Sequence, residues 1–200
     1  TDDDLRRSVD DALSAGVDHV SAYSLIVEDG TPLARRVRGG ELPMPDDDVA
    51  ADRYALIDHA LTAAGMDWYE VSNWARPGGE CRHNLGYWRD GDWGGIGPGA
   101  HSHRDGRRWW NVKHPRTYAE RLADGLSPED DHEVVTPDQR HVEHVMLGLR
   151  LAEGMPVEHL DGAIVADLVD EGLVHRTGDR VVLTYRGRLL ADAVVRRLVD

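Results

Sequence analysis

Apolar side chains in the first third of the chain recur at helical spacing in two segments and form short runs in two others. Residues 2–13 and 46–64 carry them three or four positions apart, begin with acidic residues and end before a glycine, as amphipathic helices do. Residues 17–26 and 66–72 are short runs typical of partly buried strands. The order helix, strand, helix, strand predicts an α/β fold, with a parallel sheet and crossover helices that form part of a larger (β/α) barrel.

The second half of the chain has a different pattern. Its predicted elements are helices at 118–126, 140–151, 163–171 and 188–199, a β-hairpin at 173–183, and an acidic, proline-containing connection at 127–137. Helices followed by a hairpin and a further helix are typical of a winged-helix-like module. We therefore predict three regions: the C-terminal part of a partial barrel at 1–114, a connection at 115–138, and a small, mainly helical, winged-helix-like domain at 139–200.

The composition argues against several classes of function. The formal net charge is −14, whereas a nucleic-acid interface needs a basic surface. The winged module still raises a DNA-binding regulator as an alternative, but its candidate recognition helix, residues 161–171, has four acidic residues and no basic one. No apolar run is long enough to cross a bilayer. One cysteine, Cys81, fits a cytoplasmic location. The start at Thr1 rather than Met indicates either a fragment of a longer protein or a processed chain.

A basic, aromatic and glycine-rich segment lies inside this acidic chain. All six tryptophans fall between residues 68 and 110, and eight glycines lie in the range 78–99. Residues 74–113 carry seven Arg or Lys side chains against four Asp or Glu. Loops of this kind over the carboxyl ends of parallel strands are where such folds place their sites, although loops that simply cover one end of the sheet would have the same composition.

The sequence His83-Asn84-Leu85-Gly86-Tyr87-Trp88 is the strongest candidate site within that segment. An imidazole can ligate haem iron, and the Tyr and Trp rings offer flat faces to a macrocycle. The guanidinium groups of Arg76, Arg82 and Arg89 suit propionate carboxylates. The alternative is a structural segment in which His83 caps a helix and the aromatic rings pack.

Other motifs carry weaker signals. Residues 95–100 match the dinucleotide fingerprint G-x-G-x-x-A, but Pro98 removes a backbone donor and the residues that follow, 101–106, are predicted to be a polar turn rather than a helix. His101 and His103 share the spacing of one strand face, yet no third metal ligand accompanies them.

Two further positions are open to more than one interpretation. Glu70 and Asn73 lie at a predicted strand end, where polar groups face a site as readily as they form a solvated loop. Cys81 is more consistent with an inert thiol than with an iron ligand.

These motifs resemble one family over essentially the whole chain. Residues 69–78, followed by Cys81-Arg82-His83-Asn84-Leu85-Gly86-Tyr87-Trp88 and by Gly95-Ile96-Gly97-Pro98-Gly99-Ala100-His101-Ser102, are similar to the HemW branch of radical S-adenosylmethionine (SAM) haem chaperones, relatives of the oxygen-independent coproporphyrinogen III oxidases. The string His-Asn-x-x-Tyr-Trp is a specific signature of that branch. Residues 145–151 and 183–190 resemble the family's C-terminal domain.

The resemblance implies a radical SAM partial barrel with bound SAM and a [4Fe–4S] cluster on a Cys-x-x-x-Cys-x-x-Cys loop, which this chain lacks. No metal ligands of its own are therefore expected, except that His83 is a possible ligand of haem iron, and this piece by itself should be catalytically inactive. The resemblance also implies haem binding by His83, Asn84, Tyr87 and Trp88. Three positions are implied to face the cofactor: Ile26, Gly97 and His101.

The function implied is that of a haem chaperone, which binds haem and delivers it to haem-requiring proteins. The enzyme alternative is oxygen-independent coproporphyrinogen III oxidase, in which a SAM-derived radical decarboxylates the substrate oxidatively. The His-Asn-x-x-Tyr-Trp string favours the chaperone.

Overall fold

The computed structural model describes residues 1–199, which form two compact units. The first comprises Thr1–Glu80 and the second begins at Cys81. The two units are defined by spatial compactness alone. The domain boundaries predicted at residues 114 and 138 therefore stay a prediction. Among the helices of residues 1–199, none combines the length and apolar character that a bilayer-spanning segment requires.

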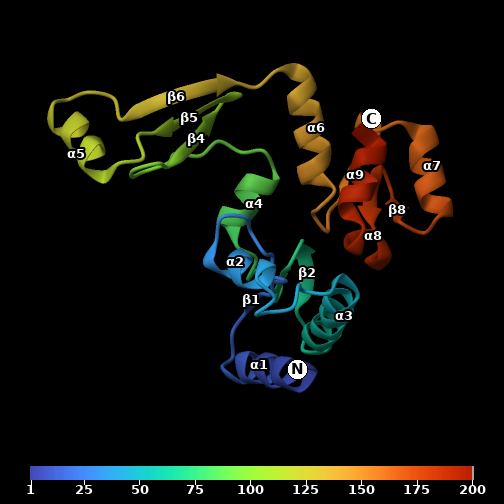
Figure 1. Ribbon diagram of the computed structural model, residues 1–200. Coiled ribbons are helices and arrows are strands. Elements are labelled where there is room, and N and C mark those ends of the chain that lie inside the picture. Colours follow the sequence, from blue (N-terminus) through green and yellow to red (C-terminus); the bar gives the residue numbers. More distant parts are fainter. Residues whose placement is uncertain (200) are drawn as a thin grey trace. The chain divides into compact units, whose positions relative to one another are not determined.

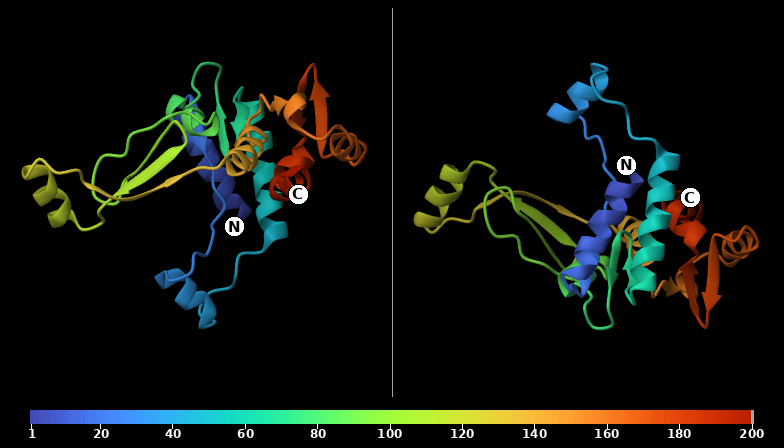
Figure 2. Two further views of the ribbon diagram at one scale, coloured as in Figure 1. Left: turned by 90° about the horizontal axis from the view of Figure 1, so that it is seen from above. Right: turned by 90° about the horizontal axis from the view of Figure 1, so that it is seen from below.

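The first unit is built on two helices whose starts are encoded locally. Its elements are α1 (Asp2–Ser14), β1 (His19–Ser21), α2 (Pro32–Arg38), α3 (Asp47–Ala63), β2 (Asp67–Glu70) and β3 (Asn73–Ala75). Helix α1 begins with a capping box between Thr1 and Asp4, and the side chain of Asp46 caps α3. The two helices lie side by side (Figure 2, blue and teal). They enclose a core whose buried members are Val9, Ile57, Leu61, Met66 and Trp74.

The sheet of the first unit differs from the predicted parallel one. Its order is β1-β3-β2, and β3 pairs antiparallel with both neighbours. Strands β1 and β2 thus run in the same direction, as the crossover pattern predicted, but β3 lies between them. The prediction was wrong because Val71 and Ser72 reverse the chain directly after β2, and three residues are too few to show a strand pattern.

The predicted strand at 17–26 is also shorter than expected. Pairing covers His19–Ser21, and the Ala22 N–H donates to the Ser72 carbonyl (2.8 Å). Within the described residues the following segment, 23–27, is not part of a strand. It leaves Tyr23, Leu25 and Ile26 exposed.

The second unit begins with a short helix and a meander. Its first elements are α4 (Arg82–Trp88), β4 (His101–Arg104), β5 (Arg107–Asn111), α5 (Pro115–Ala123) and β6 (Glu129–Val134). The three strands form an antiparallel sheet in the order β4-β5-β6, and α5 lies beyond one end of it (Figure 1).

Two predictions in this region were wrong. Residues 101–104 form a strand rather than part of a polar turn, and the predicted connection at 127–137 contains β6. Strand β6 has the sequence Glu-Asp-Asp-His-Glu-Val, in which only Val134 is apolar. Residues 129–134 form a strand because their backbone pairs with β5. Their side chains do not alternate between apolar and polar, so the sequence gives no sign of that pairing.

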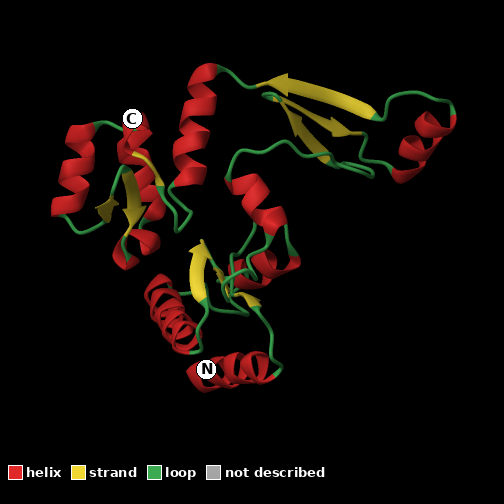
Figure 3. Ribbon diagram, turned by 180° about the vertical axis from the view of Figure 1, so that it is seen from behind, coloured by secondary structure: helices red, strands yellow, loops and turns green. Residues whose placement is uncertain are grey.

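The chain ends in a helical module around a small sheet. The remaining elements are α6 (Pro137–Gly148), β7 (Met155–Pro156), a 3₁₀ turn (Val157–His159), α7 (Gly162–Asp170), β8 (Val174–Thr177), β9 (Arg180–Leu183), α8 (Tyr185–Leu189) and α9 (Ala191–Val199). The predicted hairpin is confirmed as β8 and β9, with β7 paired to β9 (Figure 3). The predicted helix at 188–199 is divided at Leu190 into α8 and α9.

The core of this module is apolar and closely packed. Its fully buried members include Val145, Leu149, Leu168, Val181 and Val194. Close packing extends to the backbone, because a Cβ atom added at Gly187 would lie 1.9 Å from the carbonyl oxygen of Leu173. A side chain at that position cannot be accommodated without moving α8 away from Leu173.

We expect Gly187→Ala to destabilise the module by about 1–3 kcal/mol, the usual cost of overpacking. The matched control is Gly162→Ala at the start of α7, where an added Cβ would meet nothing within 4 Å. Urea unfolding followed by circular dichroism measures both. An unfolding midpoint of Gly187→Ala equal to that of the control would contradict the packing argument.

Candidate functional site

Helix α4 carries the candidate haem segment and presents two of its residues on one face. Its seven residues follow Cys81 as N-cap, and the chain turns away at Asp90, whose φ is +54°. Because residues four apart share a helix face, His83 and Tyr87 lie together. Their ring centroids are 4.8 Å apart with perpendicular planes. Both side chains are exposed, Tyr87 to 38%, so an imidazole and a phenol ring face solvent as a pair.

Two more rings of the second unit extend the exposed pair. Tyr87 contacts Trp93 edge-on at 5.0 Å, and Trp93 contacts His103 at 4.7 Å. We call these four side chains, His83, Tyr87, Trp93 and His103, the aromatic row. The row runs from the solvent-exposed His83 to His103, which is 2% exposed. Neither Trp93 nor its contact with Tyr87 was predicted, although Asp90-Gly91 directly after the helix is a turn signal that returns the chain.

Backbone contacts hold the inner end of the row. The Trp93 N–H donates to the His103 carbonyl (2.9 Å), and the His103 N–H donates to the Trp93 carbonyl (3.0 Å). Two glycines allow the backbone segments around Trp93 to pass this close to one another. A Cβ at Gly91 would lie 2.8 Å from the Gly86 carbonyl oxygen, and one at Gly95 would lie 2.0 Å from that of His101.

The two histidines of β4 do not converge on a metal. His101 is exposed and its ring lies 5.7 Å from that of Trp110, whereas His103 is buried against Trp93. Within residues 1–199 no group of three metal-ligating side chains is close enough to hold an ion.

The glycine-rich loop 94–100 leads into a strand, which supports the rejection of the dinucleotide fingerprint. Its backbone groups bind the protein itself. The Gly95 N–H donates to Ser102 Oγ (2.8 Å), and the Gly97 N–H donates to the Tyr118 hydroxyl (3.1 Å). Asn111 Nδ2 donates to the Gly97 carbonyl (2.9 Å). The loop is therefore tied down at Gly97, while Ile96 is 94% exposed beside it.

Asn84 and Trp88 lie four residues apart on a different side of α4 from His83. Trp88 lines a cavity of about 270 Å³ together with His144, Met155, His159 and other residues of the C-terminal module. Arg89 donates two hydrogen bonds to the carboxylate of Glu153 (3.1 and 3.0 Å) beside this cavity. The four predicted haem-binding residues thus fall on two sides of the helix, and His83 is not among those that line the cavity.

The three arginines predicted to bind propionates differ in whether their guanidinium groups are already bound to other groups of the protein. Arg89 is paired with Glu153, and Arg76, in the first unit, donates to the Ala64 carbonyl (2.9 Å). Arg82 is exposed on α4 next to His83. Of the three, Arg82 is placed to meet an anion near the imidazole.

In the first unit, Glu70 and Asn73 are buried rather than solvated. Asn73 Nδ2 donates to Glu70 (2.7 Å) and to the Tyr23 hydroxyl (3.1 Å), and the Ser21 hydroxyl donates to Asn73 Oδ1 (2.5 Å). Ser21, Asn73 and Glu70 occupy one cross-strand row of the sheet. This network fixes the orientation of Tyr23 at the edge of the first unit's cavity.

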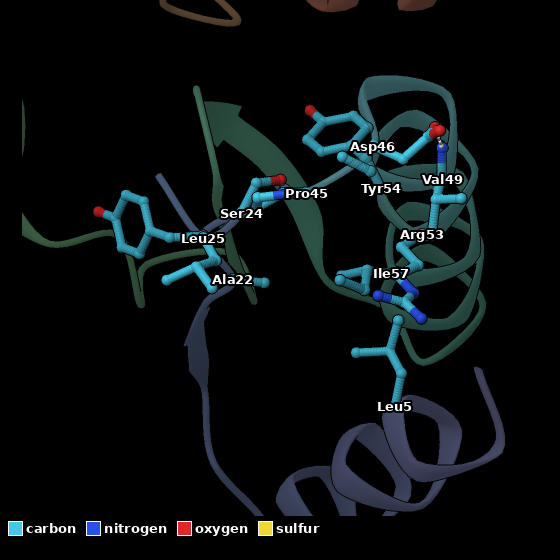
Figure 4. Close-up of a pocket in the computed structure, with 12 residues that line it drawn as sticks. Leu5, Ala22, Ser24, Leu25, Pro45, Asp46, Val49, Arg53, Tyr54 and Ile57 are labelled. Carbon is cyan, nitrogen blue, oxygen red and sulfur yellow. Dashed lines mark hydrogen bonds between the residues drawn. The ribbon is translucent and has the colours of Figure 1, made fainter. Parts of the chain in front are cut away.

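That cavity, of about 380 Å³, lies between α1, α3 and the segment after β1 (Figure 4). Leu5 from α1, Ala22 and Leu25 from the segment after β1, and Ile57 from α3 supply apolar walls. Ile26 is 72% exposed and is not among the lining residues.

Comparison with known proteins places this geometry in a class. The fold matches the solved structure titled "Coproporphyrinogen III oxidase (HemN) from Escherichia coli is a Radical SAM enzyme", with a TM-score of 0.71 at 18% identity. The match covers 98% of this chain and 51% of that one. The predicted α/β class, related to the radical SAM fold, is therefore confirmed.

The sequence comparisons identify the family. Residues 135–190 match the HemN C-terminal domain. The whole chain is 60% identical to "Heme chaperone HemW" of Mycobacterium tuberculosis (strain ATCC 25618 / H37Rv) and covers 52% of it. Over 95% of its length it is 36% identical to "Heme chaperone HemW" of Bacillus subtilis (strain 168), of which it covers 53%. The chain is thus a partial sequence of the HemN-like family, as the motifs predicted, and spans about half the length of these curated relatives.

The cavity beside Trp88 generates a prediction on pH. Burial lowers the pKa of His144, and the neighbouring His159 lowers it further. The unfolded state then binds more protons than the folded state below about pH 6.5, so stability is lost as the pH falls through that value toward the lower folded pKa. We expect the urea midpoint to drop between pH 7.5 and pH 5.5, and to drop less in His144→Asn. His175→Asn, at an exposed position of β8, is the control. Equal pH dependence in His144→Asn and wild type would contradict this assignment.

Proposed function

We propose that the full-length protein is a cytoplasmic haem chaperone that binds haem and delivers it to haem-requiring proteins. The observation that carries the proposal is the exposed pair of His83 and Tyr87 on α4, 4.8 Å apart, inside the His-Asn-x-x-Tyr-Trp string. Relatives at 60% and 36% identity bear the name heme chaperone. Both findings support haem as the ligand of this surface.

The chemistry of the surface suits a cargo that is held and then released. A neutral imidazole is an axial ligand of haem iron, and a phenol ring at its edge gives the macrocycle an apolar contact. Because His83 and Tyr87 are exposed, a bound porphyrin would remain accessible to an acceptor. Arg82, exposed beside His83, would meet a propionate.

The roles proposed for Asn84 and Trp88 are less direct. Both lie on a different side of α4 from His83, and Trp88 lines the cavity with His144 and His159. We propose that Trp88 contacts an edge of the bound porphyrin or holds α4 against the C-terminal module.

SAM and a [4Fe–4S] cluster belong to the proposal for the full-length protein. Cys81 is the one cysteine among these 200 residues, so they do not supply the three thiolates of a Cys-x-x-x-Cys-x-x-Cys loop. Toward SAM we propose Ile26, Gly97 and His101 as cofactor-facing residues. Ile26 and His101 are exposed, and Gly97 is held in its loop by Tyr118 and Asn111.

Two other functions are weaker. The likeness to coproporphyrinogen III oxidase is at 18% identity and concerns the fold, whereas the relatives of higher identity are named chaperones. A DNA-binding role is disfavoured because the candidate recognition helix, α7, is acidic. Its exposed side chains Asp167 and Asp170 would repel phosphate.

We expect His83→Ala in the full-length protein to weaken haem binding by about tenfold or more, the equivalent of about 1.4 kcal/mol. The Soret band should shift as well, because an iron ligand is lost. Absorbance titration with haem measures both, and His175→Ala, which removes an exposed imidazole from β8, should behave as wild type. An unchanged Soret band and affinity in His83→Ala would remove His83 from this role.

Turnover separates the chaperone from the oxidase. We expect the reconstituted full-length protein, kept anaerobic with SAM and a reductant, to leave coproporphyrinogen III undecarboxylated. Chromatography of the extracted porphyrins measures the product. Conversion to protoporphyrinogen would reverse the assignment in favour of the oxidase.

A further inference from the structure

We propose that Trp93 is a positioning residue of the haem site, which sets the orientation of the His83 imidazole through Tyr87. The inference rests on the proposed function and adds a residue that lies outside the His-Asn-x-x-Tyr-Trp string. It follows from three consecutive ring contacts of 4.8, 5.0 and 4.7 Å along the aromatic row.

Contacts within α4 are not enough to hold the two exposed rings of the aromatic row, those of His83 and Tyr87, in one orientation. Helix α4 has seven residues, and isolated helices of that length are marginal in water. Tyr87 is 38% exposed in the last turn, so only part of its ring is restrained by packing. A fixed orientation at His83 therefore needs a contact from outside the helix.

Trp93 supplies that contact from a rigid position. Its backbone exchanges two hydrogen bonds with His103 of β4, and its ring packs on the buried His103 imidazole. Strand β4 is in turn paired along its length with β5. The indole is thereby fixed to the sheet on one side, and its other contact, with Tyr87, lies at 70° between ring planes.

The chain between α4 and Trp93 is shaped to make the contact. Gly91 donates to the Gly86 carbonyl (2.9 Å), and a Cβ at Gly91 would come within 2.8 Å of that oxygen. Asp92 accepts from the Asp105 N–H (3.0 Å), which ties the returning segment to the β4–β5 turn. The close reversal places Trp93, six residues after Tyr87, against its ring.

Orientation matters because the side chains around a metal ligand set its angle and hence the electronic structure of the metal. For ferric haem, the plane of an axial imidazole relative to the porphyrin nitrogens determines the anisotropy of the electron paramagnetic resonance (EPR) signal. A residue that acts only on the stability of the fold would leave that anisotropy unchanged once the protein is folded. The EPR spectrum therefore separates positioning from a purely structural role.

The test uses full-length protein loaded with ferric haem. Trp93→Leu and Trp93→Val remove the ring, and the second suits an extended backbone. Both variants should broaden or shift the low-temperature EPR signal and raise the haem dissociation rate about tenfold. Their far-UV circular dichroism spectra should match that of the wild type, which shows that they are folded. Trp93→Phe, which keeps a flat ring in place, should restore the wild-type signal.

Trp109→Leu is the matched control, since Trp109 lies in β5 and contacts Arg107 rather than the aromatic row. It should leave the signal unchanged. A wild-type EPR spectrum and dissociation rate in a folded, ring-less Trp93 variant would overturn the inference, as would a Trp93→Phe variant no better than Trp93→Leu. If His83→Ala changes the Soret band and the Trp93 variants change nothing, the inference fails and the proposed function stands. If His83→Ala also changes nothing, both fail.

Discussion

The backbone bridge between Trp93 and His103 is the contact on which the candidate site depends. It holds an indole ring where the chain returns from α4, and that ring meets Tyr87, which meets His83. Gly91 and Gly95 lie on either side of Trp93, and at both a Cβ would collide with a carbonyl oxygen. At these two positions glycine has a local cause, because backbone must pass close to backbone for the rings to come into contact.

The two side chains at the centre of the proposed haem site, His83 and Tyr87, lie on an exposed face of α4. The C-terminal module contacts the same helix from a different side, through Trp88 and the paired Arg89 and Glu153. Helix α4 therefore connects the proposed haem-binding face to the HemN C-terminal domain that residues 135–190 define.

The sequence predicted best the elements whose signals are local. Helices α1 and α3 have capping residues, helical spacing and a terminating glycine, and their bounds were predicted closely. Strands β3 and β6 were missed, because three residues carry no periodicity and because an acidic edge strand has no apolar face. Topology was wrong in the first unit for the same reason, since the missed β3 separates β1 from β2.

The residues of the candidate site could be predicted from the sequence motif, but their arrangement in space could not. The string at His83 identified the residue types, and helical spacing explains why His83 and Tyr87 meet while Trp88 faces elsewhere. Trp93 depends on a turn and a backbone bridge between residues ten positions apart, which no spacing rule contains.

A structure of the full-length protein with haem bound tests the central claim most directly. We predict a bond between iron and a ring nitrogen of His83, with Tyr87 and Trp93 still in edge contact behind it. Iron bound elsewhere, with the porphyrin seated in the cavity between Leu25 and Ile57 or beside His144, would contradict it.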